Sequence, residues 1–210
     1  MSDITIWTYD WVPEGPRGFV RDLRLRWACE ESGLRYRVKT VPFKDRQTNH
    51  LGQHPFGQVP MLCDGDIELF ESGAGLLHIA RKSEALMPGD ERQAAKVVQW
   101  IVAALSSVEI VTIPWWYIEK AGPSENPLSG WMATRLDQLE AVLETREWLV
   151  SDRFTAADLL MADVLRDDKI CDFGSRPATQ AYVSRAVDRP AFQAAYDAQM
   201  EHFSSSSATD

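Results

Sequence analysis

The chain has 210 residues, which is enough for two compact domains that each bury a core. Its formal net charge of -9 argues against a nucleic-acid groove or an anionic membrane as the main partner, because both need clustered cations. Three widely spaced cysteines indicate neither a disulfide framework nor a zinc site. The N-terminus has no signal-like segment, and we expect no membrane span, no metal and a cytoplasmic location.

The first elements predicted in chain order are a strand, a helix and a second strand. β-branched and aromatic residues predict strands at 4–9 and 36–41. Between them, apolar residues recur every three or four positions over 18–32, which is typical of an amphipathic helix, and Gly33 fits its end. A strand, helix, strand unit predicts a parallel crossover.

A hairpin and a helix follow. Residues 48–52 allow only a short helix before the next strand. Asp64, Gly65 and Asp66 separate two β-like runs, 59–63 and 67–70, and Asp-Gly favours a tight turn. A helical pattern then covers 72–81. The predicted order, βαβαββα, describes a small α+β domain in which the hairpin adds antiparallel strands to the same sheet.

Beyond the break at 86–89 the pattern is all helical. A long helical stretch covers 92–118, interrupted or kinked near Pro114, and a second covers 128–146. Three more are predicted at 154–166, 179–187 and 191–202. We therefore expect a first domain at 1–83, a linker at 84–90, an all-α helical-bundle domain at 91–203 and a disordered tail at 204–210.

One chemical motif lies where the chain enters the hairpin, at Gly57, Gln58, Val59 and Pro60. If the Val59-Pro60 bond is cis, the chain turns there and Val59 presents its backbone groups outward, where an extended peptide could pair with them. An ordinary trans bond at the start of a strand is the alternative.

A second motif, Glu71 and Ser72, lies between the hairpin and the helix that follows it. A helix N-terminus offers unpaired N–H groups and a partial positive charge, and the Ser72 hydroxyl adds a donor, so a small carboxylate would be held well there. Plain helix capping by Ser72 is the alternative. Together the two motifs suit a ligand that is a short peptide with a free amino-acid end.

Three stretches of the chain resemble the glutathione transferase family. The strongest is residues 54–80, HPFGQVPMLCDGDIELFESGAGLLHIA, and residues 26–34, RWACEESGL, resemble the first helix of the family. In the second half, residues 154–165 resemble its buried helix, with Thr155 and Asp158 as a capping box. The resemblance implies a thioredoxin-like domain followed by a helical domain, and it covers about residues 3–202.

The resemblance also implies roles for particular residues. Val59 would pair through its backbone with the cysteinyl part of glutathione, Pro60 would fix the cis turn, and Gln58 may help at the same edge. Glu71 and Ser72 would hold the γ-glutamyl end. The candidates for the glycyl carboxylate are Lys44, Arg46 and His50, which could equally be solvated surface residues.

The thiol-activating group is the point at which the chain departs from the family. Many relatives carry a Ser or Tyr donor near the end of the first strand, because a hydrogen bond aimed at sulfur favours the thiolate. Residues 9–21, YDWVPEGPRGFVR, are longer than usual and have Phe19 or Gly18 where many relatives have Ser. Tyr9 is the first candidate. The rival is the pair of backbone N–H groups of Gly18 and Phe19, assisted by the charge of Arg17 or Arg21.

The resemblance implies an enzyme that transfers glutathione to a small hydrophobic electrophile, acts as a homodimer and needs no metal. The electrophile pocket is expected between the domains and lined by aromatic residues, although packing is an equal reading of the same residues: Trp11, Trp115, Trp116 and Tyr117. A reductase, dehalogenase or isomerase on the same fold is one alternative function. A non-catalytic ligand-binding or interaction protein is another.

Overall fold

The computed structural model describes residues 4–122 and 124–205, which form two compact units. The first unit contains the described residues up to Glu84 together with those from Pro190 onward, and the second is Ala85–Arg189. The boundary falls inside the predicted linker. Leu86 of that linker is fully buried, and its carbonyl accepts a hydrogen bond from the Ala156 N–H, which fastens it to the second unit.

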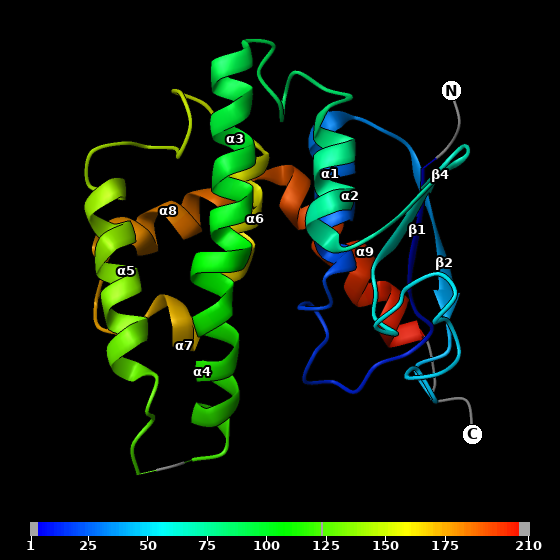
Figure 1. Cartoon of the computed structure of the whole chain (residues 1–210), viewed down its shortest axis with the longest axis horizontal. Helices are drawn as coiled ribbons and strands as arrows, with labels where there is room; N and C mark the ends of the chain where they lie inside the picture. Colours follow the sequence, from blue (N-terminus) through cyan, green and yellow to red (C-terminus); the bar gives the residue numbers. More distant parts are fainter. Residues whose placement is uncertain (1–3, 123, 206–210) are drawn as a thin grey trace. The chain divides into compact units, whose positions relative to one another are not determined.

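A four-stranded sheet is the centre of the first unit, in the order β2-β1-β3-β4 (Figure 1). Strand β1 pairs in parallel with β2, and β3 pairs antiparallel with both β1 and β4. Strand β3 begins two residues later than predicted, because the chain still turns at 59–60. The bounds are β1 (Ile4–Tyr9), β2 (Tyr36–Val41), β3 (Met61–Asp64) and β4 (Ile67–Phe70).

Two helices of this unit, α1 (Asp22–Ser32) and α2 (Ser72–Ala80), pack against each other beside the sheet (Figure 1). Gly75 allows their close approach, since a Cβ there would lie 2.9 Å from a methyl carbon of Leu25. Helix α1 begins at Asp22, later than the periodicity predicted, and ends at Gly33 in the left-handed conformation.

Helix α9 (Pro190–Ser205) packs on α1 and belongs to the first unit. The sequence had assigned residues 91–203 to the helical domain. Buried polar contacts account for the difference: Gln199 on α9 donates hydrogen bonds to Asp22 (2.7 Å) and to the Val20 carbonyl (2.9 Å). Residues 204 and 205 of the predicted tail lie in α9, and 206–210 lie outside the described residues.

The second unit is helical throughout its regular structure. Helix α6 is buried along almost its whole length and contacts α3, η1 and α8. The four-residue helix α7 was missed because so short a segment carries no periodicity. The bounds are α3 (Glu91–Ala103), η1 (Ala104–Glu109), α4 (Ile110–Lys120), α5 (Ser129–Leu143), α6 (Ala156–Leu165), α7 (Asp168–Cys171) and α8 (Pro177–Val187).

Elements α3, η1 and α4 form one helical stretch from Glu91 to Lys120. The irregular part is the π-helical segment η1, upstream of Pro114, which lies inside α4. By length and composition this stretch could cross a membrane, with a mean hydropathy of 1.7 over 18 residues, contrary to the expectation from the sequence. Small polar residues such as Ser106 interrupt the apolar run without lowering that mean far. This is weak evidence for a span, because buried core helices pass the same test.

Asp158 connects α6 to two other parts of the second unit. The predicted capping box is confirmed, with Thr155 and Asp158 bonded reciprocally. The carboxylate also accepts hydrogen bonds from the Leu149 N–H (2.8 Å) and the Tyr182 hydroxyl (3.1 Å). Burial raises the pKa of Asp158 to about 6, although these hydrogen bonds oppose the rise, so the group is mainly ionised at pH 7.5.

We expect Asp158→Asn to lower the free energy of unfolding by roughly 2–4 kcal/mol at pH 7.5, because an amide NH₂ group would face buried donors that lose their acceptor. Urea denaturation measures the change. The matched control is Asp90→Asn, at an exposed N-cap that accepts one hydrogen bond, with an expected change under about 0.5 kcal/mol. Equal effects of the two substitutions would contradict the role assigned to Asp158.

Candidate functional site

The pairing of three strands brings the predicted site residues to one end of the sheet. Met61 of β3 lies opposite Trp7 of β1 and Phe70 of β4. Tyr9 is the last residue of β1, Val59 and Pro60 immediately precede β3, and Glu71 and Ser72 immediately follow β4. Three neighbouring chain segments therefore meet at the same end of the sheet. They hold Tyr9, the candidate thiol partner; residues 57–60, called the clamp segment because they were predicted to pair with a peptide; and Glu71 and Ser72, called the cradle because they were predicted to bind a carboxylate.

The clamp segment, residues 57–60, precedes the ladder of β3. The Val59-Pro60 peptide bond is cis, as the family resemblance implied. Gly57 has φ 62°, and a Cβ there would lie 2.6 Å from the Arg46 carbonyl oxygen, so both backbone angle and space require glycine. The Val59 side chain is buried with residues of β2, β3, α9 and the loop before α1: Val12, Val20, Val41, Met61 and Phe203.

The cradle is the N-terminus of α2. Glu71, the N-cap, has φ 73°, an uncommon conformation for a residue other than glycine and one that recurs at functional sites. Ser72 is buried, and its Oγ accepts a hydrogen bond from Nη1 of Arg24 at 3.0 Å. Arg24 was missed from the sequence, where it looked like one of several polar residues between the apolar positions of the first helix.

The Tyr9 hydroxyl lies near the clamp segment. It donates a long hydrogen bond, 3.4 Å, to the Gly57 carbonyl, and the ring makes an edge contact with Phe43, with centroids 5.3 Å apart. Burial raises the pKa of Tyr9, and the nearby charge of Arg46 opposes part of that rise. The hydroxyl therefore keeps its proton at neutral pH and can donate it.

The rival donors for the thiol lie outside the first turn of α1, because the helix begins at Asp22. Gly18 and Phe19 belong to the preceding turns, and the Phe19 N–H donates to the Pro16 carbonyl at 2.9 Å. Arg17 Nε donates to the Val12 carbonyl at 3.3 Å, within the same loop. This geometry favours Tyr9 over the amide pair.

Helix α9 holds both ends of the segment from Tyr9 to Asp22. His202 Nε2 lies 2.9 Å from the Tyr9 carbonyl oxygen, and Gln199 bonds to Val20. In the middle of the segment, Gly18 has φ 79° and packs beneath Tyr196, where a Cβ would lie 2.7 Å from a ring carbon. The long loop is therefore fixed by a helix almost 180 residues away in sequence.

The segment predicted as a short helix, 48–52, forms turns instead. His50 in this segment is buried, and both ring nitrogens are engaged, Nε2 with the Gln58 carbonyl at 3.0 Å and Nδ1 with the Asn49 side chain. His50 therefore supports the clamp segment through the backbone of Gln58. Lys44 and Arg46 are exposed, and Arg46 lies over the Phe43 ring at 4.3 Å.

The predicted electrophile-site residues divide between the two units. Trp11, in the first unit, makes an edge contact with Phe43, with centroids 5.8 Å apart. In the second unit Trp116 donates from its indole nitrogen to Asp167 at 3.0 Å, and Tyr117 is largely exposed. The hydrogen bond to Asp167 indicates that Trp116 has a packing role.

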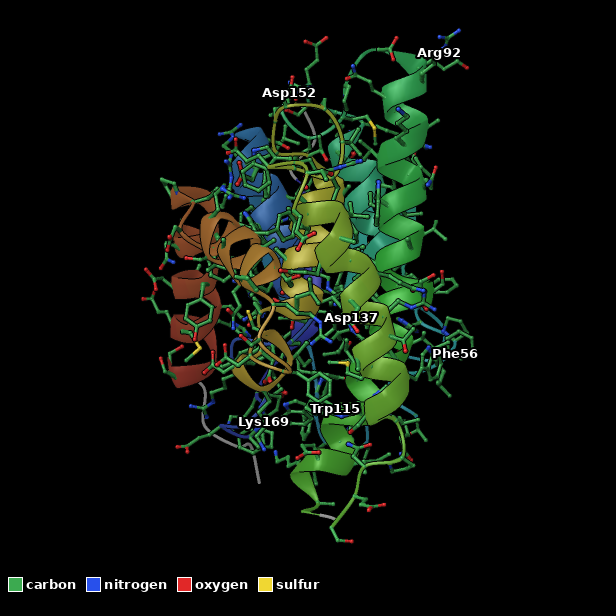
Figure 2. All side chains as sticks on the ribbon, turned by 90° about the vertical axis from the view of Figure 1, so that its left-hand side faces the viewer. Phe56, Arg92, Trp115, Asp137, Asp152 and Lys169 are labelled. Atoms are coloured by element: carbon green, nitrogen blue, oxygen red, sulfur yellow. The ribbon has the colours of Figure 1, made fainter. Side chains whose placement is uncertain are left out.

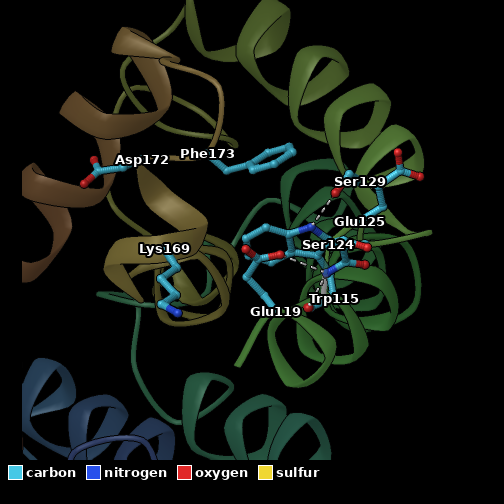
Figure 3. A pocket seen from close by; sticks show the side chains of 9 residues that line it. Trp115, Glu119, Ser124, Glu125, Ser129, Lys169, Asp172 and Phe173 are labelled. Carbon is cyan, nitrogen blue, oxygen red and sulfur yellow. Dashed lines mark hydrogen bonds between the residues drawn. The ribbon is translucent and has the colours of Figure 1, made fainter. Parts of the chain in front are cut away.

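Trp115 lies on the wall of a cavity of about 710 Å³ in the second unit. Its indole nitrogen donates to Ser129 at 3.1 Å, and Phe173 projects toward it from the far side (Figure 3). The lining mixes these aromatic rings with acidic and amide groups, and its described residues include neither Trp116 nor Tyr117.

Comparison with known proteins decides the family. The N-terminal domain model of glutathione S-transferase matches residues 15–81, and the C-terminal domain model matches residues 119–190. Glutathione S-transferase 1 of Zea mays is 30% identical over 192 residues, which cover 81% of this chain and 88% of the maize protein. The chain belongs to the glutathione S-transferase family. It is thus an enzyme of the glutathione transferase type.

Solved structures share the fold of this glutathione transferase. Poplar glutathione transferase F1 superposes with a TM-score of 0.79 at 20% identity, covering 96% of this chain and all of that one. A Burkholderia graminis glutathione transferase, with two glutathione molecules bound per subunit, has a TM-score of 0.78 at 22% identity, covering 93% of this chain and 88% of its own. Both agree with a thioredoxin-like domain followed by a helical domain.

Proposed function

We propose that this glutathione transferase binds glutathione at the end of the sheet where Tyr9, Val59 and Ser72 lie. Val59, with Pro60 and Gln58, would pair with the cysteinyl part, and Glu71 and Ser72 would hold the γ-glutamyl end. The observation that supports the proposal is the antiparallel pairing of β3 with β1 and β4, which brings the end of β1, the segment before β3 and the start of α2 to the same end of the sheet.

The dimensions of this end of the sheet agree with a small peptide. Neighbouring strands lie about 4.8 Å apart, so the ends of β1 and β4, on either side of β3, are about 10 Å apart. An extended chain advances about 3.3–3.6 Å per residue, so a tripeptide covers a similar length. The glycyl carboxylate would then lie toward the exposed cations Lys44 and Arg46, while His50 supports Gln58 through its backbone.

Tyr9 is the proposed thiol-activating group. A thiol is a weak nucleophile until it loses its proton, and a hydroxyl donor aimed at sulfur favours the thiolate. The long bond from Tyr9 to the Gly57 carbonyl is weak enough to be replaced by a bond to sulfur.

In the proposed reaction the thiolate sulfur forms a bond to an electrophilic carbon, and the leaving group departs with its electron pair. Trp11 and Phe43 supply an aromatic surface beside Tyr9, which favours a flat apolar co-substrate. Trp115, Trp116 and Tyr117 remain predictions for the same role. A cytoplasmic location and independence of metal remain part of the proposal.

We expect Ser72→Ala to weaken glutathione binding by roughly 1–3 kcal/mol, about 5- to 150-fold in Kd, because a buried hydrogen bond to a charged group is lost. Isothermal titration calorimetry measures Kd. The matched control is Ser106→Ala, at an exposed helical serine, which should leave Kd unchanged. An unchanged Kd for Ser72→Ala would reject the γ-glutamyl assignment.

Tyr9→Phe should lower kcat by about 10- to 100-fold and raise the pKa of the bound glutathione thiol by about 1–2 units, because the thiolate loses a donor worth roughly 1.5–3 kcal/mol. The thiolate absorbance, followed against pH in the binary complex, reports that pKa. Tyr36→Phe is the control, because Tyr36 pairs with Ile4 and so lies at the other end of the sheet from Tyr9. If Tyr9→Phe behaves like the control, backbone donors of residues 18–19 take over the role.

Two other functions fit the same fold, and the co-substrate separates them from conjugation. Consumption of an aromatic halide with glutathione supports transfer, whereas turnover of a mixed glutathione disulfide supports reduction, and dehalogenation or isomerisation would appear only with the matching substrate. Glutathione-independent binding of an apolar dye, with no turnover of either test substrate, would favour a non-catalytic carrier.

We also propose a homodimer. Phe56, labelled in Figure 2, is 69% exposed and is next in sequence to the clamp segment. Such exposure of a large aromatic is costly in water and is offset when a second copy covers it. The second unit also exposes large apolar residues: Val102, Ile110, Tyr117 and Trp131.

Sedimentation velocity tests the dimer. Phe56→Ser should shift the protein toward monomer by at least tenfold in dissociation constant, since burying one phenylalanine is worth roughly 1.5–3 kcal/mol. Ile67→Thr changes an exposed residue at the turn end of the hairpin and is the control. A wild-type protein that sediments as a monomer would reject the proposal.

A further inference from the structure

A buried guanidinium lies against the hydroxyl proposed to hold the γ-glutamyl group. Arg24 on α1 is 3% exposed and Ser72 at the start of α2 is 4% exposed. Nη1 of Arg24 is 3.0 Å from the Ser72 Oγ. The close packing of Leu25 against Gly75 keeps the two helices at the separation that this bond requires.

The chemistry of the pair determines which group donates. A guanidinium has five N–H donors and no acceptor, so Ser72 must accept in this hydrogen bond. The hydroxyl proton of Ser72 is then directed away from Arg24 and is available to another acceptor. A serine without this partner could rotate its hydroxyl among several orientations.

We propose that Arg24 is a positioning residue for glutathione, which orients the Ser72 hydroxyl toward the γ-glutamyl carboxylate. This rests on the function proposed above. A carboxylate oxygen bonded to Ser72 would lie about 5–6 Å from the guanidinium, given hydrogen bonds of about 3 Å on either side of Oγ. Arg24 therefore acts on the carboxylate through the Ser72 hydroxyl and not by a direct hydrogen bond.

The second buried arginine of α1 shows a different arrangement. Nε of Arg26 is 2.7 Å from Asp22, and both side chains are buried, so this cation has a carboxylate of its own helix as counter-ion. Asp22 in turn accepts from Gln199 of α9. Arg26 therefore serves the packing of α1 and α9, which makes it a matched control for Arg24.

A double-mutant cycle tests the inference through the Kd for glutathione, measured by calorimetry. Arg24→Met should weaken binding roughly tenfold in the wild-type background, and less than about twofold when Ser72 is already alanine, because its effect passes through that hydroxyl. The KM for glutathione should rise with little change in kcat at saturation, since Arg24 does not contact the sulfur.

Two further measurements separate positioning from a general effect on folding. A glutathione analogue that lacks the γ-glutamyl α-carboxyl group should bind the wild type and Arg24→Met with nearly equal Kd. Arg24→Lys, which keeps a charged donor, should recover part of the lost affinity and serves if the methionine variant fails to fold. Arg26→Lys should lower the unfolding midpoint while leaving the Kd for glutathione unchanged.

The outcomes distinguish this inference from the proposed function. If Ser72→Ala leaves Kd unchanged, the γ-glutamyl assignment falls, and the role of Arg24 falls with it. If Ser72→Ala weakens binding but Arg24→Met and Arg24→Lys do not, or if the losses from Arg24→Met and Ser72→Ala simply add, the inference is overturned and the proposed site stands.

Discussion

The register of β3 against its two antiparallel neighbours is the constraint on which the site depends. Met61 faces Trp7 on one side and Phe70 on the other, so the end of β1, the segment before β3 and the start of α2 lie at the same end of the sheet. A slip of one residue would turn every side chain of β3 to the opposite face and bury the wrong set. Core packing of the sheet and alignment of the site are therefore one requirement.

Helix α1 connects the site to helices α2 and α9 through buried polar contacts. Its Arg24 contacts Ser72 at the start of α2, and its Asp22 receives hydrogen bonds from Arg26 and from Gln199 of α9. Helix α9 also reaches the Tyr9 carbonyl through His202. Buried polar groups need partners, so these contacts specify how the helices meet as well as holding them together. The unusually long loop before α1 is thereby ordered without secondary structure of its own.

Features set by neighbours in sequence were predictable. The strands 4–9, 36–41 and 67–70, the Asp-Gly turn and the capping box of α6 all follow from local residue types at short spacings. The cis Val59-Pro60 bond was implied only by the family resemblance, because the local motif left the isomer open. Predictions failed where local signals were weak or ambiguous. Residues 48–52 form turns in place of a helix, and the residues before Asp22 extended the helical periodicity without being helical. The sequence analysis did not single out the apolar stretch from α3 to α4, because scattered polar residues interrupt it although its mean hydropathy is high.

By itself, the sequence determined most of the strands and the longer helices, the family and the segments that carry the Val-Pro and Glu-Ser motifs, because these depend on residues a few positions apart. Only the tertiary structure decided which long-range partners those segments have. Arg24 meets Ser72 across 48 residues, and α9 joins the first unit through contacts that span more than 170 residues. Local propensity carries no information on such pairs, because they are selected by the packing of whole helices and by the need to satisfy buried charges.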